Sequence, residues 1–170
     1  MNMLGGKRTR GFTVVELLVV IAIIATLATI TLIAYNGMQA RTYDASVQTD
    51  LADNSKVLTN YYADNGSFPT EAQLASISPK LKFVKANYGT SVNAVLYCRT
   101  ADGSKMALIV ESKSGKAFYV SDTAHVAKDF TASFPNGVST DCPGAGISSA
   151  DPTTSNWLHT TAAGWDAWVQ

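Results

Sequence analysis

The stretch GFTVVE at residues 11–16 is followed at once by LLVVIAIIATLATITLIA at residues 17–34, a run without a charged side chain. At 1.5 Å per residue, a helix over residues 12–34 is about 35 Å long, enough to cross the ~30 Å hydrocarbon core of a bilayer. The rest of the chain is rich in Ser, Thr, Ala and Gly and has too little apolar surface to enclose such a helix. The stretch therefore predicts a transmembrane helix over residues 12–35.

The segment before this helix, residues 1–11, contains Lys7, Arg8 and Arg10 and no acidic residue. Cationic flanks stay on the cytoplasmic side, so we expect the residues beyond Tyr35 to lie outside the cytoplasm. A secretory signal would have a shorter apolar core followed by a small-residue cleavage site, and no such site follows this run. The candidate processing site instead precedes the run, between Gly11 and Phe12, and residues 1–11 are interpreted as a cleaved basic leader.

Glu16 is the one acidic residue in this part of the chain. A carboxylate costs about 2.5–3.5 kcal/mol at the centre of a transmembrane helix and less near an end. One interpretation is an interfacial acid in the first helical turn, where the helix dipole favours a negative charge. The other interpretation is that Glu16 pairs with a cation of a neighbouring subunit. If cleavage frees the α-amine of Phe12, the Phe12 ammonium of that neighbour would neutralise Glu16 and set the register between subunits.

The segment GFTVVELLVVIAIIATLATITLIAY, residues 11–35, closely resembles the N-terminus of type IV pilins and of the pseudopilins of type II secretion. The resemblance implies cleavage by a prepilin peptidase between Gly11 and Phe12, N-methylation of Phe12 and a role for Glu16 in subunit assembly. The sequence departs from the family where many members have a helix-breaking Pro, here Ile33, and a Gly, here Ala25. We therefore expect a straighter helix than the family pattern suggests.

Beyond Tyr35 an apolar stripe continues at helical spacing, which predicts an amphipathic helix over residues 36–64 that ends at Asn65-Gly66. A loop is expected over residues 65–91, with a short helix at 70–77. The members of the stripe are Ala40, Tyr43, Val47, Leu51, Leu58 and Tyr62.

Three short runs rich in β-branched and aromatic residues predict an antiparallel meander over residues 92–121, with strands at 93–100, 105–111 and 116–121. The dipeptides Asp102-Gly103 and Ser114-Gly115 are hairpin turn signals, and residues 83–88 are a candidate fourth strand. One face of this sheet should pack on the helical stripe. The expected fold is therefore α+β and pilin-like, with a long N-terminal helix packed on a small antiparallel sheet in a globular head of residues 36–170.

The C-terminal part, residues 122–170, is rich in Ser, Thr, Gly and Pro and is interpreted as a loop region. Two cysteines on an exported chain favour a Cys98–Cys142 disulfide, worth about 3–4 kcal/mol, although two free buried thiols are the alternative. The three tryptophans, Trp157, Trp165 and Trp168, are either core-capping aromatics or a surface contact patch for a neighbouring subunit, a sugar or a host surface.

The sequence shows no pattern that indicates catalysis. His125 and His159 have no partner at zinc-ligand spacing, and there is no Gly-rich phosphate loop or Cys/His nucleophile arrangement. Asp141 and Asp151 lie in a loop without an acidic cluster that would favour calcium. The formal net charge is zero and no clustered basic surface indicates nucleic-acid binding. We expect no enzyme activity, no cofactor and no metal.

These observations predict a structural subunit that is held in the cytoplasmic membrane and then polymerised into an extracellular type IV pilus for adhesion, motility or DNA uptake. The resemblance implies as partners the prepilin peptidase, a membrane platform protein, an assembly ATPase, copies of the same chain and other pilins. The alternatives are a pseudopilin of type II secretion and a minor pilin or adhesin that binds through the tryptophan-rich C-terminus.

Overall fold

The computed structural model describes residues 11–89, 93–148, 153–160 and 164–165; for residues 153–165 it describes the backbone alone. The chain divides into two compact units, Met1–Gln39 and Ala40–Gln170. We call the first the anchor unit and the second the head unit. Residues 1–10 of the predicted basic leader, residues 1–11, lie outside the described residues.

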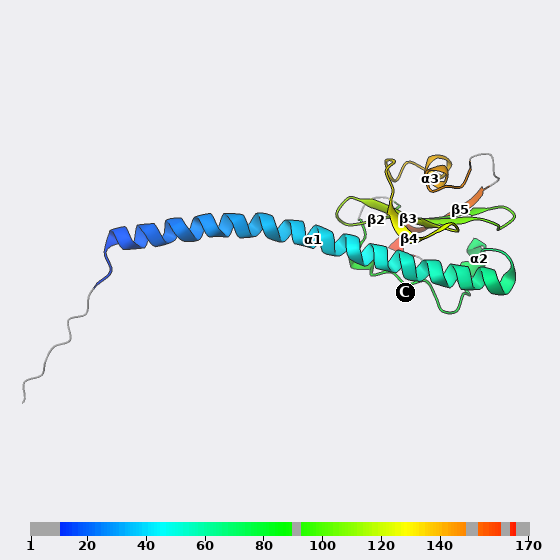
Figure 1. Ribbon diagram of the computed structural model, residues 1–170, viewed down its shortest axis with the longest axis horizontal. Coiled ribbons are helices and arrows are strands. Elements are labelled where there is room, and N and C mark those ends of the chain that lie inside the picture. The colour runs from blue at the N-terminus through cyan, green and yellow to red at the C-terminus, as the bar shows by residue number, and fades with distance from the viewer. Residues whose placement is uncertain (1–10, 90–92, 149–152, 161–163, 166–170) are drawn as a thin grey trace, which may run out of the picture. The chain divides into compact units, whose positions relative to one another are not determined.

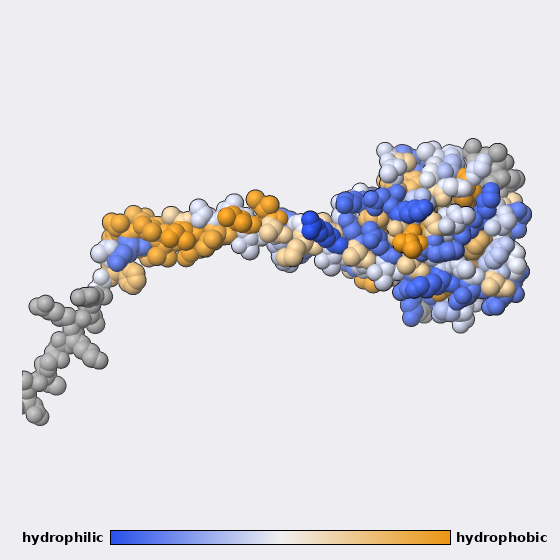
Figure 2. All heavy atoms as spheres, in the orientation of Figure 1, coloured by the Kyte–Doolittle hydropathy of each residue, from blue (hydrophilic) through white to orange (hydrophobic). Residues whose placement is uncertain are grey.

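Helix α1 (Val14–Asn65) ends one residue beyond the predicted end and contributes to both units (Figure 1). In the anchor unit its large apolar side chains are 45–74% exposed, and hydrophobic atoms cover most of the visible surface there (Figure 2). Of the described helices, it alone is long and apolar enough to cross a membrane. The hydroxyls of Thr26, Thr29 and Thr31 each donate to a carbonyl oxygen of the preceding turn at 2.8–2.9 Å, so an apolar medium leaves none of them unsatisfied.

The head unit contains a six-stranded antiparallel sheet in the order β4-β3-β2-β1-β5-β6. The strands are β1 (Val95–Thr100), β2 (Met106–Glu111), β3 (Ala117–Ser121), β4 (Ala124–Asp129), β5 (Thr153–Thr160) and β6 (Gly164–Trp165). Two short helices, α2 (Glu71–Leu74) and α3 (Val138–Gly144), and a 3-10 turn, η1 (Lys85–Asn87), complete the described elements. The first three strands agree with the predicted meander.

Two sequence expectations are wrong for the described residues. The candidate strand at 83–88 is replaced by η1, and only Tyr88 forms an isolated bridge, to Ser112. The region 122–170, interpreted as a loop, contains three strands and a helix. Strand β5 pairs along the length of β1, and the paired residues are 53 or more positions apart in the sequence. Its backbone conformation therefore depends on a tertiary partner that local propensity does not report.

Both faces of the sheet are covered. On the inner face, Val47, Leu51 and Leu58 of α1 pack with buried strand side chains such as Tyr97 and Phe118. On the outer face a second cluster is formed by Leu96, Cys98, Ala107, Ile109, Phe130, Cys142, Ala145 and Ile147. Because apolar side chains lie on both sides, β1 is buried along its whole length instead of alternating between buried and exposed positions.

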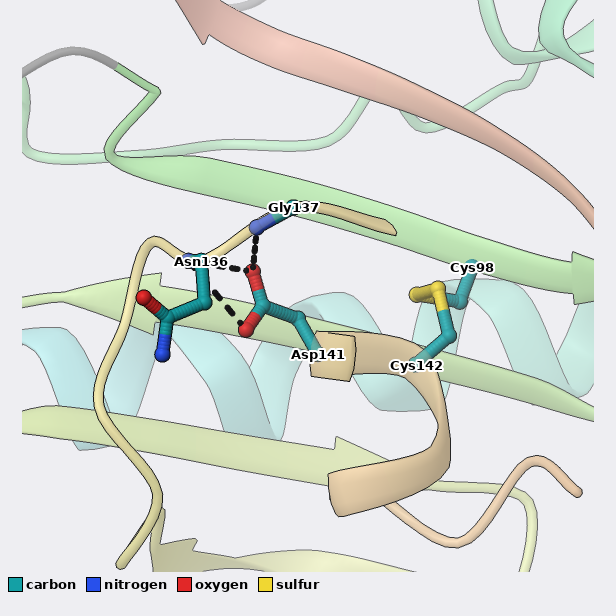
Figure 3. Close-up of a disulfide and its surroundings, with 5 residues drawn as sticks. All are labelled: Cys98, Asn136, Gly137, Asp141 and Cys142. Carbon is teal, nitrogen blue, oxygen red and sulfur yellow. Dashed lines mark hydrogen bonds between the residues drawn. A yellow bond between two sulfur atoms is a disulfide. The ribbon is translucent and has the colours of Figure 1, made fainter. Parts of the chain in front are cut away.

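The outer cover is fixed by a disulfide between Cys98 of β1 and Cys142 of α3 (Figure 3). This confirms the predicted pairing and excludes two free thiols. Next to it, the buried carboxylate of Asp141 accepts hydrogen bonds from the backbone N–H groups of Asn136 and Gly137, each at 3.0 Å (Figure 3). The covalent bond and the carboxylate together hold residues 136–142 on the sheet.

Candidate assembly site

The candidate functional site is the N-terminus of α1, where Thr13 and Glu16 form a reciprocal pair of caps. The Oε2 atom of Glu16 accepts hydrogen bonds from the backbone N–H of Thr13 at 2.9 Å and from its hydroxyl at 2.8 Å. The Thr13 hydroxyl in turn accepts from the backbone N–H of Glu16 at 3.2 Å. Helix α1 begins at Val14, so this Thr-x-x-Glu arrangement is a capping box that satisfies N–H groups left open at a helix start.

The capping box holds the Glu16 carboxylate in one orientation. Both hydrogen bonds reach the same oxygen, Oε2, and no ion pair involves Glu16 within the described part of the chain. The carboxylate is therefore oriented by its own helix, and its second oxygen, Oε1, accepts none of these hydrogen bonds. Phe12 lies four residues before it and is 83% exposed.

Gly11 and Phe12, the residues of the predicted cleavage, precede the first helical residue and are exposed. A Cβ atom on Gly11 would meet nothing within 4 Å. An exposed, uncrowded backbone outside the helix leaves a peptide bond accessible to an external protease. Gly11, Phe12 and Glu16 thus all lie in one short segment at the start of α1.

The other predicted site residues lie in the head unit. Trp157 belongs to β5, paired with Leu96, and Trp165 belongs to β6, paired with His159. Their side chains and the whole of Trp168 lie outside the described residues, so the choice between core aromatics and a contact patch stays a prediction. His125 is exposed, and its Nδ1 lies 3.3 Å from the Ser55 hydroxyl.

Sequence reasoning missed a row of polar side chains on α1 that binds the segment 82–88. Asn54 donates to the carbonyl of Lys82 at 2.8 Å and accepts from its N–H at 2.9 Å. Asp50 accepts from the N–H of Val84 at 2.7 Å and from the Tyr88 hydroxyl at 2.9 Å. Ser46 accepts from the side-chain amide of Asn87 at 2.8 Å. The spacing of four residues between Ser46, Asp50 and Asn54 was the available signal, because residues four apart share a helix face.

The hydrogen bonds from Val84 and Tyr88 to Asp50 are partly shielded from water. Burial raises the pKa of the Asp50 carboxyl above its ordinary value, against the lowering effect of the hydrogen bonds from Val84 and Tyr88. Burial, followed by the charge of Asp50, raises the pKa of the Tyr88 hydroxyl well above its ordinary value. The tyrosine therefore stays protonated and remains a donor to Asp50.

A long helix with an exposed apolar first half, followed by a head with an antiparallel sheet, defines a pilin-like protein. Residues 6–32 match the family model described as the prokaryotic N-terminal methylation motif. The chain is 36% identical over 121 residues to the type IV wide pilus major component PilA4 of Thermus thermophilus, covering 69% of this chain and 92% of that protein.

The major pilin PilE of Neisseria gonorrhoeae is 33% identical over 135 residues, covering 72% of this chain and 80% of that protein. The fimbrial protein EcpC of Eikenella corrodens is 35% identical over 106 residues, covering 62% of this chain and 63% of that protein. The chain belongs to the type IV pilin family, whose members are structural proteins. The resemblance and the α+β fold predicted from the sequence are confirmed.

Proposed function

We propose that the chain is a subunit of a type IV pilus that is stored in the cytoplasmic membrane, cleaved between Gly11 and Phe12 and polymerised into an extracellular filament. The observation that carries this proposal is a single oriented carboxylate, Glu16, at the start of a helix whose first half has exposed apolar side chains. The names of two relatives, a major pilus component and a major pilin, support a pilus over a secretion pseudopilus.

In the proposed mechanism, cleavage by a prepilin peptidase removes the basic leader and frees the α-amine of Phe12, which then becomes N-methylated. The Phe12 ammonium of one subunit pairs with Glu16 of a neighbour inside a bundle of apolar helices. A charge pair in such a low-dielectric setting is strong, and it fixes the axial register between the two helices. The platform protein and the assembly ATPase are the proposed partners that move each subunit from the membrane into the filament.

The test of the charge pair uses Glu16→Ala, with Glu16→Asp as the variant that keeps the charge. Glu16→Ala should enter the membrane and be cleaved but yield few sheared filaments, while Glu16→Asp should retain part of the yield. Immunoblots for the shortened chain and quantification of sheared filaments measure the two steps separately. A normal filament yield from Glu16→Ala would sink the charge-pair mechanism.

The test of processing is mass spectrometry of purified filaments. The mature chain should begin at Phe12 and have one added methyl group on its α-amine. Filaments built from chains that begin at Met1 would contradict the proposed cleavage, whatever the role of Glu16.

A further inference from the structure

The charged side chains of the head unit are unevenly distributed along the part of α1 that belongs to it. At one end, the exposed cations Arg41, Lys113 and Lys116 gather around the first turns of this part of the helix. The ammonium of Lys113 lies 5.4 Å from the ring centroid of Tyr43, and that of Lys116 lies 3.6 Å from Asp44. We call Arg41, Lys113 and Lys116 the basic end.

Four carboxylates gather at the other end, about 35 Å away along the 23 residues from Arg41 to Asp64. Asp64 lies in the last turn of α1, and the rings of Tyr62 and Phe68 stack there at 4.6 Å. The N–H of Phe68 donates to the carbonyl of Gly103 at 2.9 Å, which places the β1–β2 turn beside this end of the helix. The acidic end consists of Asp64, Glu71, Asp102 and Asp122.

The position of the last two carboxylates follows from the sheet. Asp102 is part of the β1–β2 turn, and the N–H of Asp122 donates to the carbonyl of Met106, the first residue of β2, at 3.0 Å. No ion pair involves any of the four acidic-end carboxylates among the described residues. Their charges therefore face solvent or a partner.

Charges of the opposite sign at each end are fewer or engaged. At the basic end, Asp44 is buried and accepts a hydrogen bond from Ser114 besides its ion pair with Lys116. Glu111 at the end of β2 is half-buried and has a partner of its own, and Asp129 is exposed. At the acidic end, Arg99 is buried, and its guanidinium donates to three backbone carbonyls. Lys105 is half-buried and has a partner of its own. The head unit thus presents a positive surface at one end and a negative surface at the other.

We infer that the acidic end of one head unit docks against the basic end of the next copy of this chain in the filament. Complementary ends on one molecule produce a head-to-tail contact, which builds an open helical filament when the rotation between copies does not close into a ring. Complementary potentials fix orientation and suppress wrong pairings more than they add affinity. The inference rests on the proposed function, because it names the surfaces through which the polymerised heads meet.

The experiment reverses the charge at each end of the full-length chain. One variant is Asp64→Lys/Glu71→Lys and the other is Arg41→Glu/Lys113→Glu; both leave the Asp102 turn and the Lys116–Asp44 pair intact. Each variant alone should lower the yield of sheared filaments roughly tenfold, because like charges then face each other at every contact. The two reversals combined in one chain should restore the yield, and so should co-expression of the two reversed chains.

The matched control for Arg41→Glu/Lys113→Glu is Lys56→Glu/Lys82→Glu, which makes the same change of charge at exposed positions outside both ends and should assemble normally. The exposed Lys56–Asp53 ion pair that it breaks contributes little to stability. Thermal unfolding of each full-length variant in detergent excludes loss of the fold. Normal filaments from either single-end variant, or no rescue by the combined one, would overturn the inference while leaving the charge-pair mechanism intact. An unaltered chain that forms no filaments would instead refute the proposed function.

Discussion

Removing the Cys98–Cys142 disulfide should destabilise the head unit by about 4 kcal/mol. The bond joins residues separated by 44 positions, and closing a loop of this length lowers the entropy of the unfolded chain by an amount equivalent to about 4 kcal/mol at 25 °C. Both sulfur atoms are in residues that are fully buried in the outer cluster, so the replacement must stay apolar. Cys98→Ala/Cys142→Ala is therefore the appropriate variant.

The assay is thermal unfolding of the full-length chain in detergent, followed by circular dichroism. For a domain of about 130 residues, 1 kcal/mol corresponds to about 3–5 °C, so Tm should fall by roughly 10–20 °C. The unaltered chain in a strong reductant supplies the control, because it loses the bond without losing side-chain volume. A fall of less than about 3 °C in both cases would show that the outer cover does not depend on this loop closure.

Three further substitutions test the packing and electrostatics of the head unit. Leu51→Ala, at a fully buried position, should lower the free energy of unfolding by about 2–5 kcal/mol in denaturant titrations, and a loss below 1 kcal/mol would contradict its place in the inner core. Asp50→Ala should lower the free energy of unfolding by about 1–3 kcal/mol, because it leaves the Val84 N–H without its acceptor. Asp50→Asn keeps an acceptor and should be close to neutral at pH 7. Equal losses in the two variants would refute a stabilising role for this hydrogen bond. Hydrogen bonds, first from Thr100 and then from Ser104, lower the pKa of Asp102 from 3.8 to about 2. The contribution of Asp102 to stability is therefore present above pH 4 and is lost as the pH falls towards 2. Asp102→Asn should reduce the loss of stability between pH 4 and pH 2, measured from unfolding curves at several pH values. Asp122→Asn is the control, because it makes the same change of charge elsewhere. An unchanged pH dependence in Asp102→Asn would contradict the assignment.

The opposite sign applies to Asp50. Burial raises its pKa in the folded chain, so its contribution favours folding below the ordinary pKa and weakens as the pH rises through the folded value. The contact of Asp50 with Val84 and Tyr88 is thus maintained by hydrogen bonds, although burial disfavours the charge of the carboxylate. This explains why an amide at position 50 is expected to replace the carboxylate at little cost.

The helix and the first three strands could be predicted because their signals are local. A run of 18 uncharged residues, the stripe that includes Val47 and Leu51, and two Gly-containing hairpin turns depend on neighbours in the sequence. Gly103, for example, has φ +74°, which the Asp-Gly dipeptide indicates directly. Such patterns need no knowledge of the rest of the fold.

The second half of the head could not be predicted because its structure depends on distant partners. The sequence of β5, TTSNWLHT, alternates weakly and becomes a strand by pairing with β1. Helix α3 contains Pro143 in its interior, which argues against a helix, yet the disulfide and the Asp141 hydrogen bonds hold it. At the candidate site, the spacing of Thr13 and Glu16 is the sequence signal of a capping box, but the apolar residues between and after them dominate the prediction for this segment.

The structure also suggests why one helix can serve in both a membrane and a filament. Its exposed apolar side chains would cost on the order of tens of kcal/mol to leave in water, so the anchor unit requires an apolar environment. Lipid and a bundle of identical helices are similar apolar solvents, and moving the helix from one to the other changes the hydrophobic term little. Under the proposed function, the difference between the two states must then come from the polar group in the segment. In lipid Glu16 has the Thr13 donors of its own helix. By the proposed mechanism it gains an ammonium ion in the bundle, so a single carboxylate would bias an otherwise balanced transfer towards assembly.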